Sequence, residues 1–277
     1  RRRTGGRGVA VTKRRERVMA VLRTDFGFLP ESLSCDTGRI SVRDRPDREA
    51  VTQQTLESPY ISKNWIYAPP CRTKDFMTGA VTEEPFSARV FGLQKTHEIE
   101  HDDADGPEHL RFVIWCLGFF QGIRLTDTEA GFLDATPVKT GKLTDFRLVK
   151  RGIPNALDLT EDFWQRHARE PRTTKRVASI IHTLFLAQNP TYLPFEQFSY
   201  LYMALDACFA LAKAVYRDSP GRIPHYRRPK WLCERFDIPV PYWTIPSTRP
   251  SSSRSHSGFR FTAVAPKRGA AATFRWK

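Results

Sequence analysis

Residues 193–217 read LPFEQFSYLYMALDACFALAKAVYR, and apolar side chains recur through them at the spacing of an α-helix. Pro194 suits the first helical turn, where its missing N–H leaves no hydrogen bond unmade. A second apolar line runs through Tyr202 and Met203. The pattern predicts a strong helix from Pro194 to about Arg217. Its apolar stripe consists of Phe195, Phe198, Leu201, Leu205, Cys208, Phe209, Ala212 and Tyr216.

Three further helices are predicted around this one. One is expected to begin at Thr160, whose side chain suits an N-cap, and another at Thr173 or Thr174. A last helix covers residues 228–238 and ends before a proline. Residues 159–243 are therefore expected to form a helical bundle.

The first half of the chain has the pattern of strands instead. Three segments alternate apolar and polar side chains between clusters of Pro, Gly and Asp: 38–43, 60–67 and 86–94. One apolar helix is predicted to begin after Pro107 and to end near Gly122. Residues 24–158 are thus expected to be a β-rich module with one buried helix. The chain is predicted to be α+β, a β-rich N-terminal module followed by a helical bundle.

The net charge is concentrated at the two ends of the chain. The 277 residues carry 44 Lys+Arg and 30 Asp+Glu, a formal charge of +14. Residues 1–23 contain nine of the basic residues and one acidic residue, while residues 239–277 contain seven and none. The body between them is close to neutral, which weakens the case for nucleic-acid binding by the folded part.

We expect residues 1–23 to be a disordered basic extension and residues 244–277 to be a disordered Ser/Arg/Pro-rich tail. As arms, the two ends could contact RNA or an anionic surface. They could equally be disordered tails without a binding role. Alternatively, the C-terminal segment, which has no acidic residue, could have been translated outside its native reading frame. The candidate nucleic-acid-binding side chains are Arg14, Arg15, Arg17, Arg249 and Arg254.

The cysteines and the hydropathy of the sequence indicate in which cellular compartment the protein is expected. The five cysteines form no CxxC motif, which favours reduced thiols in a cytoplasm. The apolar run in the helix predicted after Pro107 is too short to span a bilayer. We therefore expect a cytoplasmic protein that does not associate with a membrane.

Residues 97–109, HEIEHDDADGPEH, hold a dense group of metal-ligand side chains. An EF-hand register fails, because Phe112 falls where a bidentate Glu is required. His97, His101 and His109 could hold a transition metal together with their Asp and Glu neighbours. We interpret the segment as a solvated loop and expect no metal. Phosphate-binding glycine loops and the GxSxG elbow are also absent, so no cofactor is expected.

Asp206 is the one carboxylate within the apolar run YLYMALDACFALA. A charge there is costly unless it is paired or hydrogen-bonded. Two roles are open. Asp206 could brace a neighbouring helix through an Arg or a Tyr hydroxyl, or it could line a functional cleft.

A family resemblance rests on LPFEQFSYLYMALDACFALA and RPKWLCERFDIPVPYW. These stretches resemble the helical C-terminal region of uncharacterised bacterial proteins with a HEPN-like domain. RFVIWCLGFFQGIRL looks like the segment before that domain. The resemblance covers about half of the chain. It implies a compact helical bundle, often dimeric. In active members it implies metal-independent RNA cleavage by an Arg and a following His that are separated by four to six residues.

The sequence departs from that family at the catalytic pair. In the family the pair lies on the last helix, a place occupied here by the C-terminal tail. Arg249 and His256 have the right spacing, but they lie where no helix is expected. Arg176 and His182 lie on a predicted helix, but at the wrong end of the bundle and with Val177 where a polar residue is expected. The alternative for His182 is a helix-face histidine in partial contact with the core.

The leading hypothesis is a bacterial cytoplasmic protein with an incomplete HEPN-like domain. As the resemblance implies, the parent family acts on RNA in defence or toxin systems, and this chain lacks the catalytic Arg/His pair. The catalytic candidates are Arg176, His182 and Asp206. The alternative is a non-catalytic module that forms a homodimer and contacts nucleic acid through its basic arms.

Overall fold

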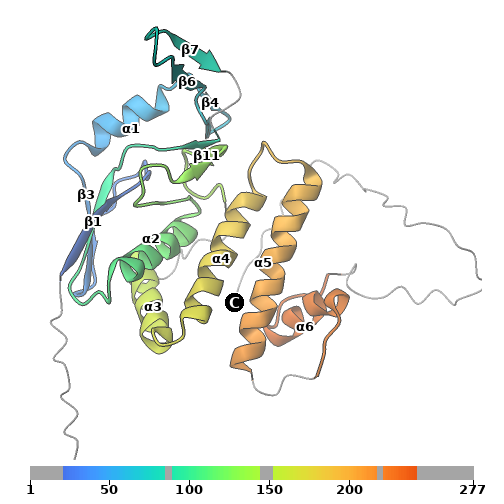
Figure 1. Ribbon diagram of the computed structural model, residues 1–277. Coiled ribbons are helices and arrows are strands. Elements are labelled where there is room, and N and C mark those ends of the chain that lie inside the picture. The colour runs from blue at the N-terminus through green and yellow to red at the C-terminus, as the bar shows by residue number, and fades with distance from the viewer. Residues whose placement is uncertain (1–20, 85–88, 144–151, 217–220, 242–277) are drawn as a thin grey trace, which may run out of the picture.

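The α+β prediction is confirmed by the computed structural model, which describes residues 21–84, 89–143, 152–216 and 221–241. Strands gather in the first half of the chain and helices in the second, as predicted (Figure 1). Both predicted basic extensions, apart from residues 21–23, lie outside the described residues, and so do Arg14, Arg15, Arg17, Arg249 and Arg254.

The main sheet has four antiparallel strands, and β9 lies inside it between β1 and β3. Along β9, His97, Ile99 and His101 are 0% exposed, whereas Glu98 and Glu100 point to the other face. The prediction of a solvated loop at 97–109 is therefore wrong, because one face of this polar-looking segment is buried. The strands are β1 (Leu22–Phe26), β9 (His97–His101), β3 (Ile40–Asp44) and β2 (Cys35–Asp36).

The other strands are short. The strand predicted at 60–67 is divided by a turn at Lys63 and Asn64, which have φ values of 52° and 65°. Of the strand predicted at 86–94, only β8 forms, and residues 86–88 lie outside the described part. The elements are α1 (Arg48–Leu56), β4 (Ile61–Ser62), β5 (Trp65–Tyr67), β6 (Cys71–Lys74), β7 (Val81–Glu84), β8 (Val90–Phe91), β10 (Phe132–Leu133) and β11 (Ala135–Pro137).

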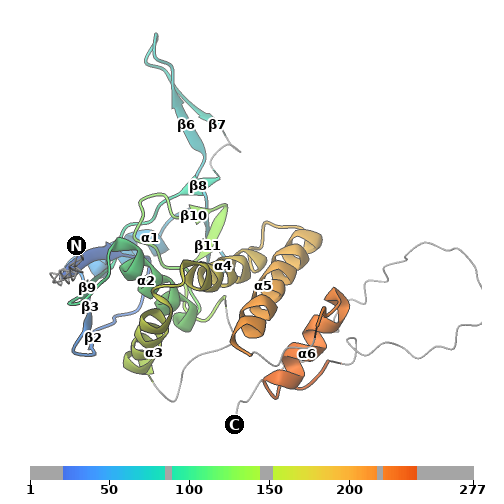
Figure 2. The same ribbon diagram turned by 60° about the horizontal axis from the view of Figure 1, so that its bottom comes forward.

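The hairpin of β6 and β7 projects away from the rest of the molecule (Figure 2). Its turn is held by Asp75, whose carboxylate accepts the backbone N–H groups of Met77 and Thr78 at 2.7 and 3.0 Å. Phe76 and Met77 at the tip are exposed.

Helix boundaries follow the sequence signals in most cases. The helix predicted from Pro107 to Gly122 is confirmed as α2 (Pro107–Gln121), and Gly122 ends it with φ 63°. The helix predicted from Pro194 is α5, and the one predicted at 228–238 is the shorter α6. The helices of the second half are α3 (Gly152–His167), α4 (Pro171–Ala187), α5 (Pro194–Val215) and α6 (Arg228–Arg235).

The predicted start at Thr160 is wrong, because α3 begins eight residues earlier at Gly152. Thr160 is buried within the helix, and its hydroxyl donates to the carbonyl of Ala156 at 2.8 Å. The hydroxyl is therefore satisfied within the helix, and its capping signal was misleading.

Apolar clusters that contain residues of both kinds of element join the strands to the helices. Leu117 of α2 and Leu157 of α3 pack in the cluster that contains Ile99 of the sheet. Phe112 of α2 packs in a second cluster with Phe185 of α4. The boundary expected after residue 158 therefore lies inside α3, which contacts both the sheet side and the helical side.

The N-terminal half of α5 is largely exposed. Phe195 and Phe198 are 65% and 67% exposed, and the buried residues of the helix are Ala204, Phe209 and Ala212. By length and composition alone, α5 is the one helix in the described part of the chain that could cross a membrane.

Candidate functional site

A pocket of about 230 Å³ lies between α2, the loop that follows it and α4. Arg111 and Trp115 enter it from α2, and His182 enters it from α4. Arg124 and the loop at 125–131 form the remaining wall. The pocket thus combines side chains that lie far apart in the sequence.

The loop wall of this pocket is fixed in place by backbone contacts. Thr126 and Gly27 exchange two backbone hydrogen bonds, 3.0 and 2.7 Å long. Lys95 donates to the carbonyl of Asp127. A Cβ atom on Gly92 would lie 1.7 Å from the carbonyl oxygen of Glu129, so only glycine allows this close approach. The pocket is therefore preorganised.

The charges around the pocket are unequally compensated. Arg111 Nε donates to both carboxylate oxygens of Asp127 at 3.1 Å, and Nη1 donates to Glu108 at 2.9 Å. Arg124 lies over the ring of Phe132, 6.0 Å from its centroid, and pairs with no carboxylate of the described residues. Burial lowers the pKa of Arg124. Its guanidinium remains charged, because the ordinary value is far above neutral. The pocket thus holds a cation that has no anionic partner among the residues that the structure describes.

His182 is the one sequence-predicted candidate that lines this pocket. Its ring meets the edge of Trp115, with centroids 4.6 Å apart. Burial and the charge of Arg124 lower the pKa of His182 to about 4, so the ring is neutral at pH 7. A neutral imidazole beside a guanidinium can donate a hydrogen bond to an anion or take a proton from it.

Arg176 and Asp206 lie elsewhere. Arg176 is exposed on α4, and six helical residues place it about 240° around the axis from His182. Asp206 pairs with Arg228, whose guanidinium also lies 4.8 Å from the ring centroid of Phe209. His225 lies 3.7 Å from the same carboxylate. Of the two roles left open for Asp206, the geometry favours bracing, here of α5 against α6.

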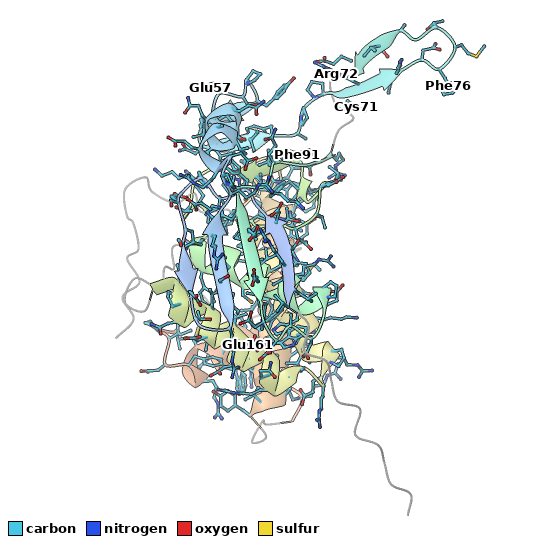
Figure 3. All side chains as sticks on the ribbon, turned by 90° about the vertical axis from the view of Figure 1, so that its left-hand side faces the viewer. Glu57, Cys71, Arg72, Phe76, Phe91 and Glu161 are labelled. Atoms are coloured by element: carbon cyan, nitrogen blue, oxygen red, sulfur yellow. The ribbon has the colours of Figure 1, made fainter. Side chains whose placement is uncertain are left out.

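A second cluster of polar side chains is buried at one end of the main sheet. Figure 3 marks Glu161 there, at the opposite end from Phe91. Nε2 of His101 lies 3.0 Å and Nε2 of His109 lies 2.9 Å from the same oxygen of Glu161. Gln165 donates to the other oxygen at 2.6 Å. Burial alone would raise the pKa of Glu161, but these hydrogen bonds outweigh it and hold the pKa well below its usual range.

His101, His109 and Glu161 are close enough together to hold a metal ion. Their hydrogen bonds assign them another role. The backbone N–H groups of Asp103 and Asp105 donate to Nδ1 of His101 and His109, at 3.1 and 3.2 Å. Each Nδ1 is therefore an acceptor, so each Nε2 carries the proton and donates it to Glu161. A metal-bound histidine usually donates its other ring N–H. The arrangement is thus a hydrogen-bonded His–Glu–His cluster joining β9, α2 and α3.

An aromatic ring also packs against this His–Glu–His cluster. His109 stacks on Trp164 with centroids 4.3 Å apart and planes 4° apart. The indole N–H of Trp164 donates to Asp105 at 2.9 Å. Sequence reasoning missed Glu161 as the partner of the histidines, and it missed Arg124 in the pocket. The one available signal was the alternation of HEIEH, which places His97 and His101 on the same face of a strand.

Comparisons with known proteins give no relative on which to base a function: no protein-family model, no curated protein and no solved structure matches the chain. The candidate site therefore rests on its own geometry and chemistry.

Proposed function

We propose that the chain binds RNA and that the pocket around Arg124 and His182 takes one of its phosphate groups. The observation behind the proposal is Arg124, a half-buried cation that lines a preorganised pocket. It pairs with no carboxylate in the described part of the chain. Arginine is suited to phosphate because its planar fork can donate two parallel hydrogen bonds. A neutral His182 adds a third polar group at the same place.

We further propose that the protein is a bacterial cytoplasmic protein of the HEPN-like kind and that it binds RNA without cleaving it. The separation of Arg176 and His182 around α4 supports the absence of a catalytic pair. Labelled RNA incubated with the protein in the absence of metal should therefore remain intact. Cleavage that disappears in a His182→Ala variant would contradict this part of the proposal.

Replacing Arg124 with glutamine should weaken RNA binding about ten- to hundredfold. A hydrogen bond to a charged group contributes about 1.5–3 kcal/mol, and each 1.4 kcal/mol is about a factor of ten. Fluorescence anisotropy of a short labelled single-stranded RNA measures the change. Arg43→Gln, the same substitution at an exposed arginine on β3, serves as the matched control and should bind as the wild type does.

The basic arms provide the competing explanation for RNA binding. A triple variant with alanine at Arg14, Arg15 and Arg17 removes charge from the N-terminal arm. If this variant loses binding and Arg124→Gln does not, the RNA is held by the arm and the pocket proposal fails. Arm binding would also weaken steeply with added salt.

A second candidate function is assembly into a homodimer, and it is favoured by the exposed apolar face of α5. Contiguous apolar patches on a protein surface usually mark interaction sites. Symmetric homodimers are the commonest assemblies, and a stripe along a helix can pack against its own copy. The exposed apolar residues of this face are Leu193, Phe195, Phe198, Leu201, Tyr202 and Met203.

Replacing Phe198 with aspartate should convert a dimer into a monomer, because it buries a charge at the centre of the apolar face. Light scattering coupled to size-exclusion chromatography measures the mass. Leu159→Asp is the matched control, since Leu159 is an exposed apolar residue on α3. A wild-type chain that is monomeric at high concentration would exclude the dimer.

A further inference from the structure

The pocket around Arg124 has one uncompensated positive charge among the residues that line it, and it can gain a second. It is lined by two cations, Arg111 and Arg124, and by one anion, Asp127. Arg111 Nε donates to both carboxylate oxygens of Asp127, so the charge of Asp127 is offset by Arg111. His182 can add a further positive charge by taking up a proton when an anion offsets Arg124. Arg111, Arg124 and Asp127 are the titratable groups that line the pocket with His182.

The pocket is also small and its wall is fixed. Its volume of about 230 Å³ is below the range of about 300–1,000 Å³ that is usual for sites of drug-sized ligands. Leu125 is 1% exposed and closes part of the wall. The paired backbone hydrogen bonds of Gly27 and Thr126, and the close approach of Gly92 to Glu129, prevent the loop from moving aside. An internal phosphate has chain on both sides, and that chain would have to lie outside a pocket of this size.

We propose that the pocket recognises the terminal phosphomonoester of an RNA end rather than an internal phosphodiester; this rests on the proposed RNA binding. A phosphomonoester carries a charge of about −1.5 to −2 at pH 7 and offers three acceptor oxygens. An internal diester carries one charge and continues as chain on both sides. The uncompensated guanidinium of Arg124, the adjacent imidazole of His182 and the restricted volume all match the terminal group.

Three short single-stranded RNAs of one sequence test this proposal: one with a 5′-phosphate, one with a 3′-phosphate and one with neither. Anisotropy with the wild-type protein should give at least about tenfold tighter binding of one phosphorylated form than of the unphosphorylated RNA. The Arg124→Gln variant should lose this preference. Because the comparison of the three RNAs uses the wild type, it stands even if the variant is less stable.

The outcomes separate this inference from the proposed function. Equal affinity for all three RNAs, reduced to the same extent by Arg124→Gln, would overturn recognition of the end and leave RNA binding by the pocket intact. No binding of any of the three, or binding that Arg124→Gln does not change, would instead reject the proposed function itself. A preference for one end tells whether the 5′ or the 3′ phosphate is recognised.

Discussion

Replacing Glu161 with alanine should lower the free energy of unfolding by about 3–5 kcal/mol, the usual cost of removing one partner from a buried charged network. The substitution leaves the Nε2–H groups of His101 and His109 without their acceptor, and both rings are 0% exposed. It also removes a contact that joins α3 to β9 and α2. Urea unfolding followed by circular dichroism measures the loss.

Asp162→Ala is the matched control, because Asp162 is the next residue of α3 and its ion pair with Arg166 is exposed. Such a pair contributes about 0–1 kcal/mol, so this variant should remain close to the wild type. A Glu161→Ala variant as stable as the wild type would show that the tautomers are assigned wrongly. Added Zn²⁺ should leave the wild-type Tm unchanged, and a rise would reassign the cluster as a metal site.

Lowering the pH should remove the contribution of Glu161 to the free energy of unfolding. Its pKa is lowered in the folded chain, so the stabilisation is complete above the ordinary value of 4.5 and is lost as the pH falls below it. The unfolded chain then takes up a proton that the folded chain does not. The difference in unfolding free energy between the wild type and Glu161→Ala should therefore shrink from about pH 5 to about pH 3.

Replacing Gly92 with alanine should destabilise the protein by about 3 kcal/mol and abolish binding in the pocket. The new Cβ atom would lie 1.7 Å from the carbonyl oxygen of Glu129, so the loop wall has to move. Overpacking typically costs about 1–3 kcal/mol, and backbone on both sides of the clash leaves little room for relaxation here. Urea unfolding measures the first effect, and anisotropy with labelled RNA measures the second.

Gly221→Ala controls for the chemistry of a glycine-to-alanine change. No atom lies within 4 Å of the Cβ position at Gly221. The Gly221→Ala variant should be as stable as the wild type or slightly more stable, because alanine restricts the conformations of the unfolded chain. If Gly92→Ala behaves in the same way, the close approach to Glu129 does not hold the loop in place.

Helices were the most predictable part of this fold, because their signals are local. Pro107 and Gly122 bound α2, and Pro194 begins α5, as the sequence patterns predict. The start of α3 was missed because Thr160 resembles an N-cap, whereas the helix begins eight residues earlier, at Gly152. Several strands contain only two residues and are defined by their pairing: β8 pairs with the distant β10, whereas β2 pairs with the nearby β3.

The candidate site and the buried cluster could not be predicted, because both are formed by long-range contacts. Glu161 is 60 residues from His101 and 52 from His109. Arg124 and His182 likewise come from separate elements, and neither has a motif around it. The sequence did identify His182 as a candidate, but it paired it with Arg176, which lies on another side of α4.

The position of Glu161 has a practical consequence for dividing the chain. A cut between residues 158 and 159, where the sequence suggests two domains, would split α3 and separate Glu161 from the two histidines it serves. One fragment would then contain His101 and His109 without their hydrogen-bond acceptor, and the other would contain the Glu161 carboxylate without its two donors. The two halves are therefore interdependent, and gene fragments exchanged between homologues should cross over elsewhere than inside this helix.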